Sequence, residues 1–427
     1  MEDEESNGSN IWELYDLKGN PFSTNPILIS GGEIPITSFV GRGRELKRLE
    51  NQIMSGNGSR TIVAGNTGVG KTSFVNYALY LFNNKYFIIE VPDIGKGSST
   101  DLLYNTLFHI WVAINNEKHT DWLEENTLKQ LESISKLDRH VLTGGDLPFI
   151  GGGLEENITN PPYISFTILK NLFELIIEQI YKNQDKEIII VYDNFDKDNL
   201  PKKSIREIFN NMRDLFQTSH VHFIFIGDFN FEAIIRGIPR VSSIIPEVIE
   251  LGKLSVDEIK KILELRLDKF KKSENIKKLY EDEVISMVYN LYDGNIRDIL
   301  NTLSKAIVLN THGAPDILTS DNVRKIFREE AEKIYYSDRF SVRARKILDV
   351  IIKERKEISV KKIVEETGYK RGTVSTTLTN ELVGCVYLAK NDGKDKFYAL
   401  APEMKWLLLW FNFYKIYGFY YKPAFKI

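Results

Sequence analysis

The chain has 427 residues, of which 42% are hydrophobic and 27% charged, and its formal net charge is −3. This length predicts two or three domains, and the composition is typical of a soluble globular protein. The single cysteine, Cys385, excludes a disulfide framework and a cysteine-based metal site, and it indicates a reducing compartment.

The charge is unevenly distributed along the chain. Residues 339–427 hold 18 lysines and arginines against nine acidic residues, a net charge of +9, whereas residues 1–338 carry a net charge of −12. This asymmetry predicts a polyanionic partner for the C-terminal part. The acidic N-terminus predicts no signal peptide, and the aromatic stretch 406–421 is too short and too polar to span a bilayer. We therefore expect a cytoplasmic protein that does not associate with a membrane.

The first 37 residues are predicted to be an acidic lead-in. Residues 1–10 are acidic and rich in Ser, Asn and Gly, which predicts disorder, and Pro21, Pro26 and Pro35 indicate an extended segment after them. A helix is expected to start within residues 38–46 and to end near Ile53. It opens a nucleotide-binding core that we predict to span residues 38–252.

The segment 65–72, with the sequence GNTGVGKT, matches the pattern G-x-x-x-x-G-K-[ST]. It follows a β-branched, apolar run at 60–64 and precedes apolar residues at helical spacing, which is the strand-to-helix context of a P-loop. Its glycines let the backbone wrap a phosphate, and the helix N-terminus directs free N–H groups at it. Lys71 is expected to reach the β- and γ-phosphates of ATP, and Thr72 to ligate Mg²⁺. The nucleotide-binding residues predicted here are Gly65, Asn66, Thr67, Gly68, Val69, Gly70, Lys71, Thr72 and Ser73.

An insertion at about residues 95–165 follows the second predicted strand, 86–91. It contains two helical stretches, 100–115 and 121–135, and then a glycine-rich patch at 144–153. The patch lacks a lysine and a clear following helix, so it is predicted to be a flexible loop or hairpin tip rather than a phosphate loop. A strongly apolar helix is expected at 166–181.

A second chemical motif lies at residues 187–196, where an apolar run leads to Asp193. The pattern predicts a buried strand whose last carboxylate lies at the carboxyl edge of the sheet, where Asp193 would hold the Mg²⁺ water shell. A helix-capping aspartate is the alternative interpretation. Asn194 occupies the next position, and an amide cannot act as a base, so either Asp196 takes that role or hydrolysis is slow. Another buried strand is expected at 221–228.

The region 253–338 is predicted to be a small helical lid. Ser255 and Glu258 form a capping box at its start. Helices are expected at about 255–271, 281–292, 295–310 and 320–333. The sequence GNIR, which ends at Arg297, stands at the start of the third of these helices.

The order of these motifs over residues 38–333 resembles the AAA+ ATPases, in particular the origin-recognition, initiator-like type, with the STAND-like signalling ATPases as the second candidate. The resemblance implies that the segment around Val40 packs over the adenine and that Arg297 touches the nucleotide from the lid. It further implies that Asp228 or Asn230 orients water near the γ-phosphate. A turn residue at the end of a strand is the equally weighted alternative for that position.

The same resemblance implies an arginine that reaches the γ-phosphate of a neighbouring subunit. Arg240 is the candidate and Arg236 the reserve. A solvated surface arginine remains the alternative, because such a finger requires an oligomer.

Residues 339–427 are predicted to be a winged-helix domain followed by an aromatic tail. Helices are expected at 342–353, 360–367 and 370–382, and two strands at 385–389 and 396–400. This order resembles the winged helix that follows the lid in origin-recognition ATPases. Double-stranded DNA is the predicted partner, since a recognition helix offers hydroxyls to bases and cations to phosphates. The predicted DNA contacts are Lys370, Arg371, Thr373, Thr376, Lys390 and Lys394.

The fold class predicted from the sequence is therefore α/β, a P-loop NTPase parallel sheet with an α-helical lid and a C-terminal winged helix. The predicted function is an ATP-binding, slowly hydrolysing AAA+ switch that acts on DNA. The alternative is a STAND-like signalling ATPase, of the kind that serves phage defence, whose winged helix makes only interdomain or protein contacts. A homo-oligomer or a protein partner could use the aromatic tail, for which core packing is the default interpretation.

Overall fold

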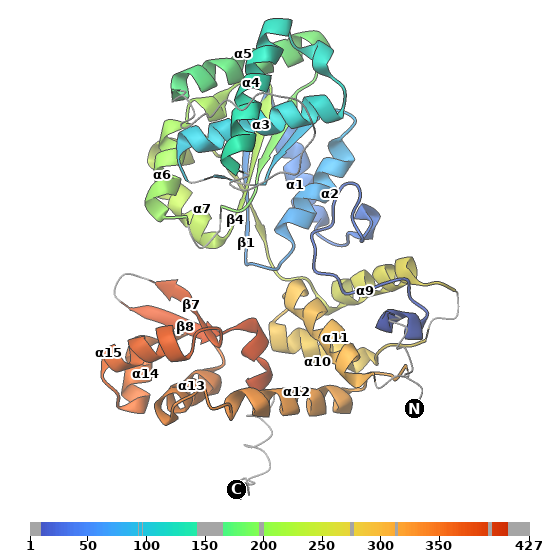
Figure 1. Cartoon of the computed structure of the whole chain (residues 1–427), viewed down its shortest axis with the longest axis vertical. Coiled ribbons are helices and arrows are strands. Elements are labelled where there is room, and N and C mark those ends of the chain that lie inside the picture. The colour runs from blue at the N-terminus through green and yellow to red at the C-terminus, as the bar shows by residue number, and fades with distance from the viewer. Residues whose placement is uncertain are drawn as a thin grey trace, which may run out of the picture. The chain divides into compact units, whose positions relative to one another are not determined.

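The computed structural model describes residues 10–92, 94, 95, 97–142, 165–195, 200–273, 277–311, 315–391 and 395–408. The chain forms two compact units (Figure 1). The core unit comprises Asn25–Gly252, and the C-terminal unit comprises the residues up to Thr24 together with those from Lys253 onward. Among the described helices, none combines the length and the apolarity that crossing a membrane requires.

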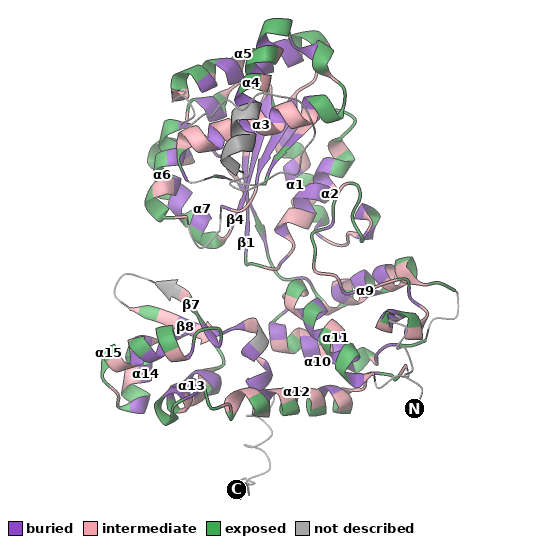
Figure 2. Ribbon diagram, viewed as in Figure 1, coloured by how far each residue is buried: buried purple, intermediate pink, exposed green. Residues whose placement is uncertain are grey.

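The core unit is built around a five-stranded sheet with the order β2-β3-β4-β1-β5, in which every neighbouring pair is parallel. The strands are almost entirely buried, as the purple arrows of Figure 2 show. A parallel sheet covered on both faces requires continuous apolar strands, and the Ile, Val and Phe runs of this sequence supply them. The strands are β1 (Arg60–Gly65), β2 (Phe87–Val91), β3 (Ile188–Tyr192), β4 (Val221–Gly227) and β5 (Glu247–Leu251).

Helices cover both faces of this sheet. On one face α1 (Gly43–Met54) and α2 (Lys71–Phe82) bury Leu49, Phe74 and Val75 against β1, β3, β4 and β5. The opposite face carries the larger apolar core. Its helices are α3 (Ser99–Asn116), α4 (Glu125–Leu142), α5 (Phe166–Gln184), α6 (Lys202–Asn211), α7 (Phe229–Arg236) and α8 (Pro239–Ser242).

The two helical stretches expected within the insertion are α3 and α4, and they belong to the core of the sheet. Leu103, Leu107 and Ile110 of α3 are fully buried in the same apolar cluster as β2 and β3. The Thr106 hydroxyl also lies 2.8 Å from the Tyr192 hydroxyl at the end of β3. The predicted glycine-rich patch at 144–153 lies outside the described residues.

The C-terminal unit begins with a helical bundle. Ser255 caps its first helix in the predicted capping box, in which the Ser255 hydroxyl and the Glu258 side chain each accept a backbone N–H. The helices are α9 (Val256–Phe270), α10 (Asp282–Tyr292), α11 (Ile296–Asn310) and α12 (Ser320–Tyr335).

The described part of the lead-in divides between the two units. A 3₁₀ turn, Ile11–Tyr15, buries Trp12 and Tyr15, and the Arg266 guanidinium of α9 donates to the carbonyls of Pro21 (3.3 Å) and Ser23 (2.7 Å). Residues 10–24 are therefore a packed part of the C-terminal unit rather than an open extended segment. Burial lowers the pKa of Arg266 to about 10, so the guanidinium stays charged at neutral pH.

The remainder of the C-terminal unit has the element order of a winged helix. Helix α13 (Val342–Glu354) is followed by the short strand β6 (Ile358–Ser359), helix α14 (Val360–Thr367) and helix α15 (Arg371–Thr376), which continues into a π-helical turn, Thr377–Glu381. An antiparallel hairpin, β7 (Val386–Asn391) and β8 (Lys396–Leu400), completes a sheet with the order β6-β8-β7.

The start of the aromatic tail packs against the helical bundle. The Trp406 ring stacks on Phe327 of α12 at 4.3 Å between centroids, and its indole N–H donates to the Tyr292 hydroxyl at 2.7 Å. The Lys305 ammonium lies 4.2 Å from the centre of the same ring. Residues 409–427 of the predicted tail lie outside the described residues.

Candidate nucleotide site

The phosphate loop connects the end of β1 to the start of α2, as the sequence predicts. Gly68 and Gly70 have φ values of 84° and 92°, a region that side-chain-bearing residues rarely adopt. Gly65 is required for another reason, because a Cβ there would lie 2.9 Å from the Leu251 carbonyl oxygen of β5. The loop therefore opens onto the N-terminus of a 12-residue helix, whose first N–H groups have no intrahelical partner.

Lys71 lies folded against this loop. Its side chain is 8% exposed, and its ammonium donates to the carbonyls of Gly65 (3.0 Å) and Asn66 (3.3 Å). The charge is thus held at the helix N-terminus, within reach of an anion bound by the loop. The Ser73 hydroxyl, also predicted to bind nucleotide, accepts a hydrogen bond from the Ile27 N–H at 3.1 Å.

Thr72 and Asp193, the two predicted magnesium ligands, are in direct contact. The Thr72 hydroxyl donates to the Asp193 carboxylate at 2.8 Å, although 121 positions separate the two residues in the chain. The contact forms because α2 starts and β3 ends at the same edge of the sheet, with β4 between β1 and β3. A hydroxyl and a carboxylate are the hard oxygen ligands that Mg²⁺ takes at such sites.

Asn194 occupies the position after Asp193 that was considered for a catalytic base, but its side chain binds a backbone carbonyl. Its backbone is left-handed, with a φ of 67°, and its side-chain amide donates to the Pro92 carbonyl at 2.9 Å. The Asp193 N–H donates to the Val91 carbonyl at 3.2 Å. These bonds join the segment after β3 to the end of β2. Asp196, the predicted substitute base, lies outside the described residues.

Glu90 of β2 is a carboxylate that the sequence reasoning did not single out. It lies in the strand beside β3, opposite Val191. More than a third of its surface is exposed, yet the surrounding protein and, secondarily, the Asp193 charge raise the pKa of its carboxyl. The sequence does offer one signal for this residue: Glu90 is the single acidic residue in the otherwise apolar strand FIIEV.

Arg42 is a second residue that the sequence reasoning did not assign. It precedes α1 with a left-handed φ of 63° and is buried. Its guanidinium donates to the Gly252 carbonyl at 2.6 Å and to the P-loop carbonyl of Val69 at 3.4 Å. Arg42 therefore ties the phosphate loop to the residue at which the chain leaves the core unit. Val40, the predicted adenine contact, is half-buried two positions earlier.

The residues predicted near the γ-phosphate have local contacts. Asp228 is the N-cap of α7 and accepts the Phe231 N–H at 2.7 Å, and its other oxygen accepts from the Asn230 amide at 2.8 Å. Arg236 lies 3.7 Å from Glu232 of the same helix. Arg240 is exposed on α8. The contacts of Asp228 are those of the alternative interpretation, a turn residue at the end of a strand.

Arg297 lies in the C-terminal unit. It is exposed and is the second residue of α11, after the N-cap Asn295, whose side chain accepts the Asp298 N–H at 3.3 Å. The sequence GNIR thus marks a capped helix start, as expected.

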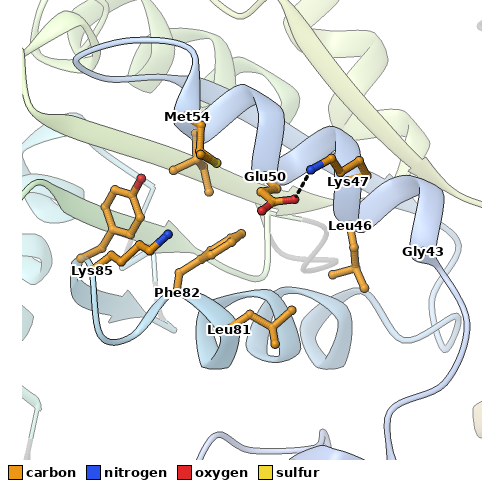
Figure 3. A pocket seen from close by; sticks show the side chains of 10 residues that line it. Gly43, Leu46, Lys47, Glu50, Met54, Leu81, Phe82 and Lys85 are labelled. Carbon is orange, nitrogen blue, oxygen red and sulfur yellow. Dashed lines mark hydrogen bonds and ion pairs between the residues drawn. The ribbon is translucent and has the colours of Figure 1, made fainter.

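A separate hollow of about 400 Å³ lies between α1 and the C-terminal end of α2 (Figure 3). Its walls include the apolar side chains of Leu46, Met54 and Phe82, and the Lys47–Glu50 ion pair (2.8 Å) lies at its side. None of its lining residues belongs to the phosphate loop.

The predicted DNA-binding surface is partly occupied by the protein itself. Lys370 and Thr376 are exposed and Thr373 is half-buried, but the Arg371 guanidinium lies 2.8 Å from the Asp395 carboxylate of the hairpin. Arg371 is therefore not a freely available cation, a point that no local sequence pattern indicates. The side chain of Lys390 and the whole of Lys394 lie outside the described residues.

A glycine-rich loop between a parallel strand and a helix, closed by Lys71 and joined through Thr72 to the aspartate of a neighbouring strand, defines a P-loop NTPase. Residues 45–305 match the model of the KAP family P-loop domain. The chain belongs to this family, and it is a nucleotide-binding protein of the P-loop class. The predicted P-loop ATPase class is thus confirmed, and the KAP family is one that the sequence reasoning did not name.

Several solved structures are similar to this chain. The ORC2 protein of Aeropyrum pernix, in ADPNP–ADP complexes, is 14% identical, with a TM-score of 0.47 over 94% of this chain and 99% of that one. The Aeropyrum pernix ORC1 protein in complex with DNA is 14% identical, with a TM-score of 0.45 over 95% and 96%. Cdc6p of Pyrobaculum aerophilum is 16% identical, with a TM-score of 0.44 over 90% and 97%. No curated protein matches.

Proposed function

We propose that this chain binds ATP with Mg²⁺, hydrolyses it, and uses the nucleotide state to control a DNA-binding winged helix. The observation that carries the first part is the 2.8 Å hydrogen bond between Thr72 and Asp193 at the mouth of the phosphate loop. It supports a site with both elements in place: N–H groups and an ammonium for phosphates, and two oxygen ligands for a metal.

Each residue of the site has a distinct task in this proposal. The loop N–H groups and the α2 N-terminus bind the phosphates, and Lys71 exchanges its carbonyl partners for phosphate oxygens. Thr72 and Asp193 would hold Mg²⁺, which supplies positive charge against the phosphate oxygens when bound. Arg42 holds the loop against Gly252, and a shift of the loop on nucleotide binding would therefore act on the connection to the C-terminal unit.

The test of the nucleotide site is a binding and turnover measurement on the full chain. Lys71→Ala removes the phosphate partner, so it should abolish ATP binding or turnover. Lys203→Ala is the matched control, because Lys203 is an exposed lysine of the same unit paired with Glu207 on α6. Wild-type affinity and turnover in Lys71→Ala would refute the site.

The proposal of DNA binding is supported by the net charge of +9 on residues 339–427 and by the exposure of Lys370 and Thr376 at the predicted recognition helix. The test is binding to several duplexes over a salt series, with and without ATP. Salt-sensitive binding supports the proposal, since phosphate contacts release counterions. Loss of Thr373 or Thr376 should change sequence preference more than affinity.

The Arg371–Asp395 pair favours a second candidate, in which the winged helix serves protein contacts. That pair neutralises one of the expected phosphate-binding cations. If the wild-type chain binds no duplex at any salt concentration, the basic surface is a solvated or protein-binding face, and a signalling ATPase of the STAND-like kind becomes the better assignment.

A further inference from the structure

The ends of β2 and β3 are joined beside the predicted magnesium ligands. The Asp193 N–H donates to the Val91 carbonyl, and the Asn194 side chain donates to the Pro92 carbonyl at 2.9 Å. Asn194 thus holds the two strand ends together with its amide. An amide has no basic site at neutral pH, so the residue after Asp193 contributes positioning but no proton acceptor.

Glu90 lies on the same face of the sheet as the phosphate-loop helix. It is opposite Val191 in the parallel register, and paired residues of neighbouring strands point to the same face. Ile88 stands two residues before Glu90 in the strand, so both side chains point to the same face. Val191 and Ile88 both pack in the apolar cluster that contains Phe74 of α2. Asp193 follows the end of β3, and its carboxylate accepts the hydroxyl of Thr72, at the start of α2. Glu90 therefore lies on the face of the sheet that carries the predicted magnesium ligands, one strand away from Asp193.

Glu90 ends in a carboxylate, which can accept a proton from water. Glu90 is also exposed enough to meet solvent, which an attacking water requires.

We propose that Glu90 is the general base of ATP hydrolysis in this protein, acting from the strand beside Asp193. The Glu90 carboxylate orients a water and takes one of its protons as the water oxygen bonds to the γ-phosphorus. The bond from that phosphorus to the β–γ bridging oxygen breaks, the electron pair leaves with ADP, and the products are ADP and inorganic phosphate. The proton on Glu90 returns to solvent. This inference rests on the proposed ATP hydrolysis.

The test is Glu90→Gln in the full chain, because the amide keeps the shape of the side chain and removes its basicity. Turnover with saturating ATP and Mg²⁺ should fall by about 10²–10⁴-fold, the usual contribution of a positioned base. ATP affinity should stay close to the wild-type value, and bound ATP should remain uncleaved on the variant. A merely structural role for Glu90 would weaken binding instead.

Three further variants make the outcome decisive. Glu250→Gln is the matched control, an exposed glutamate near the same end of β5, opposite Ala64, and it should keep wild-type turnover. Asp196→Asn separates the two candidate bases, because its turnover shows whether Asp196 takes the proton in place of Glu90. Glu90→Asp retains the charge on a shorter arm and should lose turnover in the same direction, which decides the question if Glu90→Gln does not fold.

Wild-type turnover in Glu90→Gln or Glu90→Asp would overturn the role of Glu90, and loss of turnover in Asp196→Asn alone would transfer it to Asp196. The proposed function fails in a different way. If the wild-type chain binds ATP but releases no phosphate, hydrolysis and the Glu90 base are both refuted. If Lys71→Ala keeps both the ATP affinity and the turnover of the wild type, the nucleotide site itself is wrong.

Discussion

The hydroxyl pair of Thr106 and Tyr192 provides a quantitative test of how the insertion helix α3 supports the nucleotide site. Tyr192 is fully buried at the end of β3, immediately before Asp193, and its hydroxyl lies 2.8 Å from the Thr106 hydroxyl. Thr106 also donates to the Leu102 carbonyl at 2.7 Å, so the Tyr192 hydroxyl is the donor between the two side chains. Burial raises the pKa of Tyr192, and the phenol is therefore neutral at every working pH.

Substitutions at Thr106 and at Tyr192 should lower the stability of the core unit by different amounts. Thr106→Val keeps the shape of the side chain but leaves the buried Tyr192 donor without a partner, so it should destabilise the core unit by about 1–3 kcal/mol. Tyr192→Phe removes the donor and leaves Thr106 its bond to Leu102, so it should cost about 0.5–1.5 kcal/mol. The free-energy cost of the double variant should be smaller than the sum of the two single costs, because replacing both hydroxyls by apolar groups leaves neither of them unpaired.

Hydrogen exchange of the β3 amides under native conditions measures this effect, since it reports the free energy of opening in the core unit. A coupling of about 0.5 kcal/mol or more between the two sites is expected for residues in contact. Additive costs, or a Tyr192→Phe variant more damaging than Thr106→Val, would refute the donor assignment. No change in either variant would show that α3 is not part of the cooperative core.

Three further predictions concern the proposed metal ligand and the proposed DNA-binding surface. Asp193→Asn should keep much of the nucleotide affinity and lose turnover, measured as phosphate release, and full turnover would remove Asp193 from the metal site. Lys370→Ala should reduce the log–log salt slope of DNA binding by about 0.9, the value per phosphate contact. Arg371→Ala should reduce that slope less, because Arg371 is already paired with Asp395. Equal reductions of the slope in the two variants would contradict this. Partial burial opposes ionisation of Asp395, but hydrogen bonds from backbone N–H groups and the Arg371 charge hold the pKa of its carboxyl below the usual value. Its stabilisation of the hairpin should therefore be complete above about pH 3.9, the ordinary aspartate pKa, and be lost as the pH falls below that value. Hydrogen exchange of β8 should show that loss in the wild type and not in Asp395→Asn.

The sequence alone determined the local elements of this protein. The P-loop, the strand that ends at Tyr192, the capping box at Ser255 and the C-terminal hairpin were all predictable. Each depends on neighbouring residues: glycines that permit a positive φ, an apolar run of strand length, a hydroxyl three residues before a carboxylate. Such patterns are complete within about ten residues and need no knowledge of the rest of the chain.

Only the tertiary structure decided which of these elements meet. The order of the strands places β3 beside β2, and this pairing makes Glu90 a neighbour of Asp193 and Asn194 a partner of Pro92. The register of a parallel pair is set by packing on both of its faces, which no local pattern in β2 contains.

The same holds for two arginines whose partners the sequence did not indicate. Arg42 binds Gly252 across 210 positions, and Arg371 binds Asp395 of the hairpin, because helix and strand packing bring these groups within hydrogen-bonding distance. A charged side chain looks the same in the sequence whether it is solvated or paired. Its partner, and therefore its availability to a nucleotide or to DNA, is fixed only when the chain has folded.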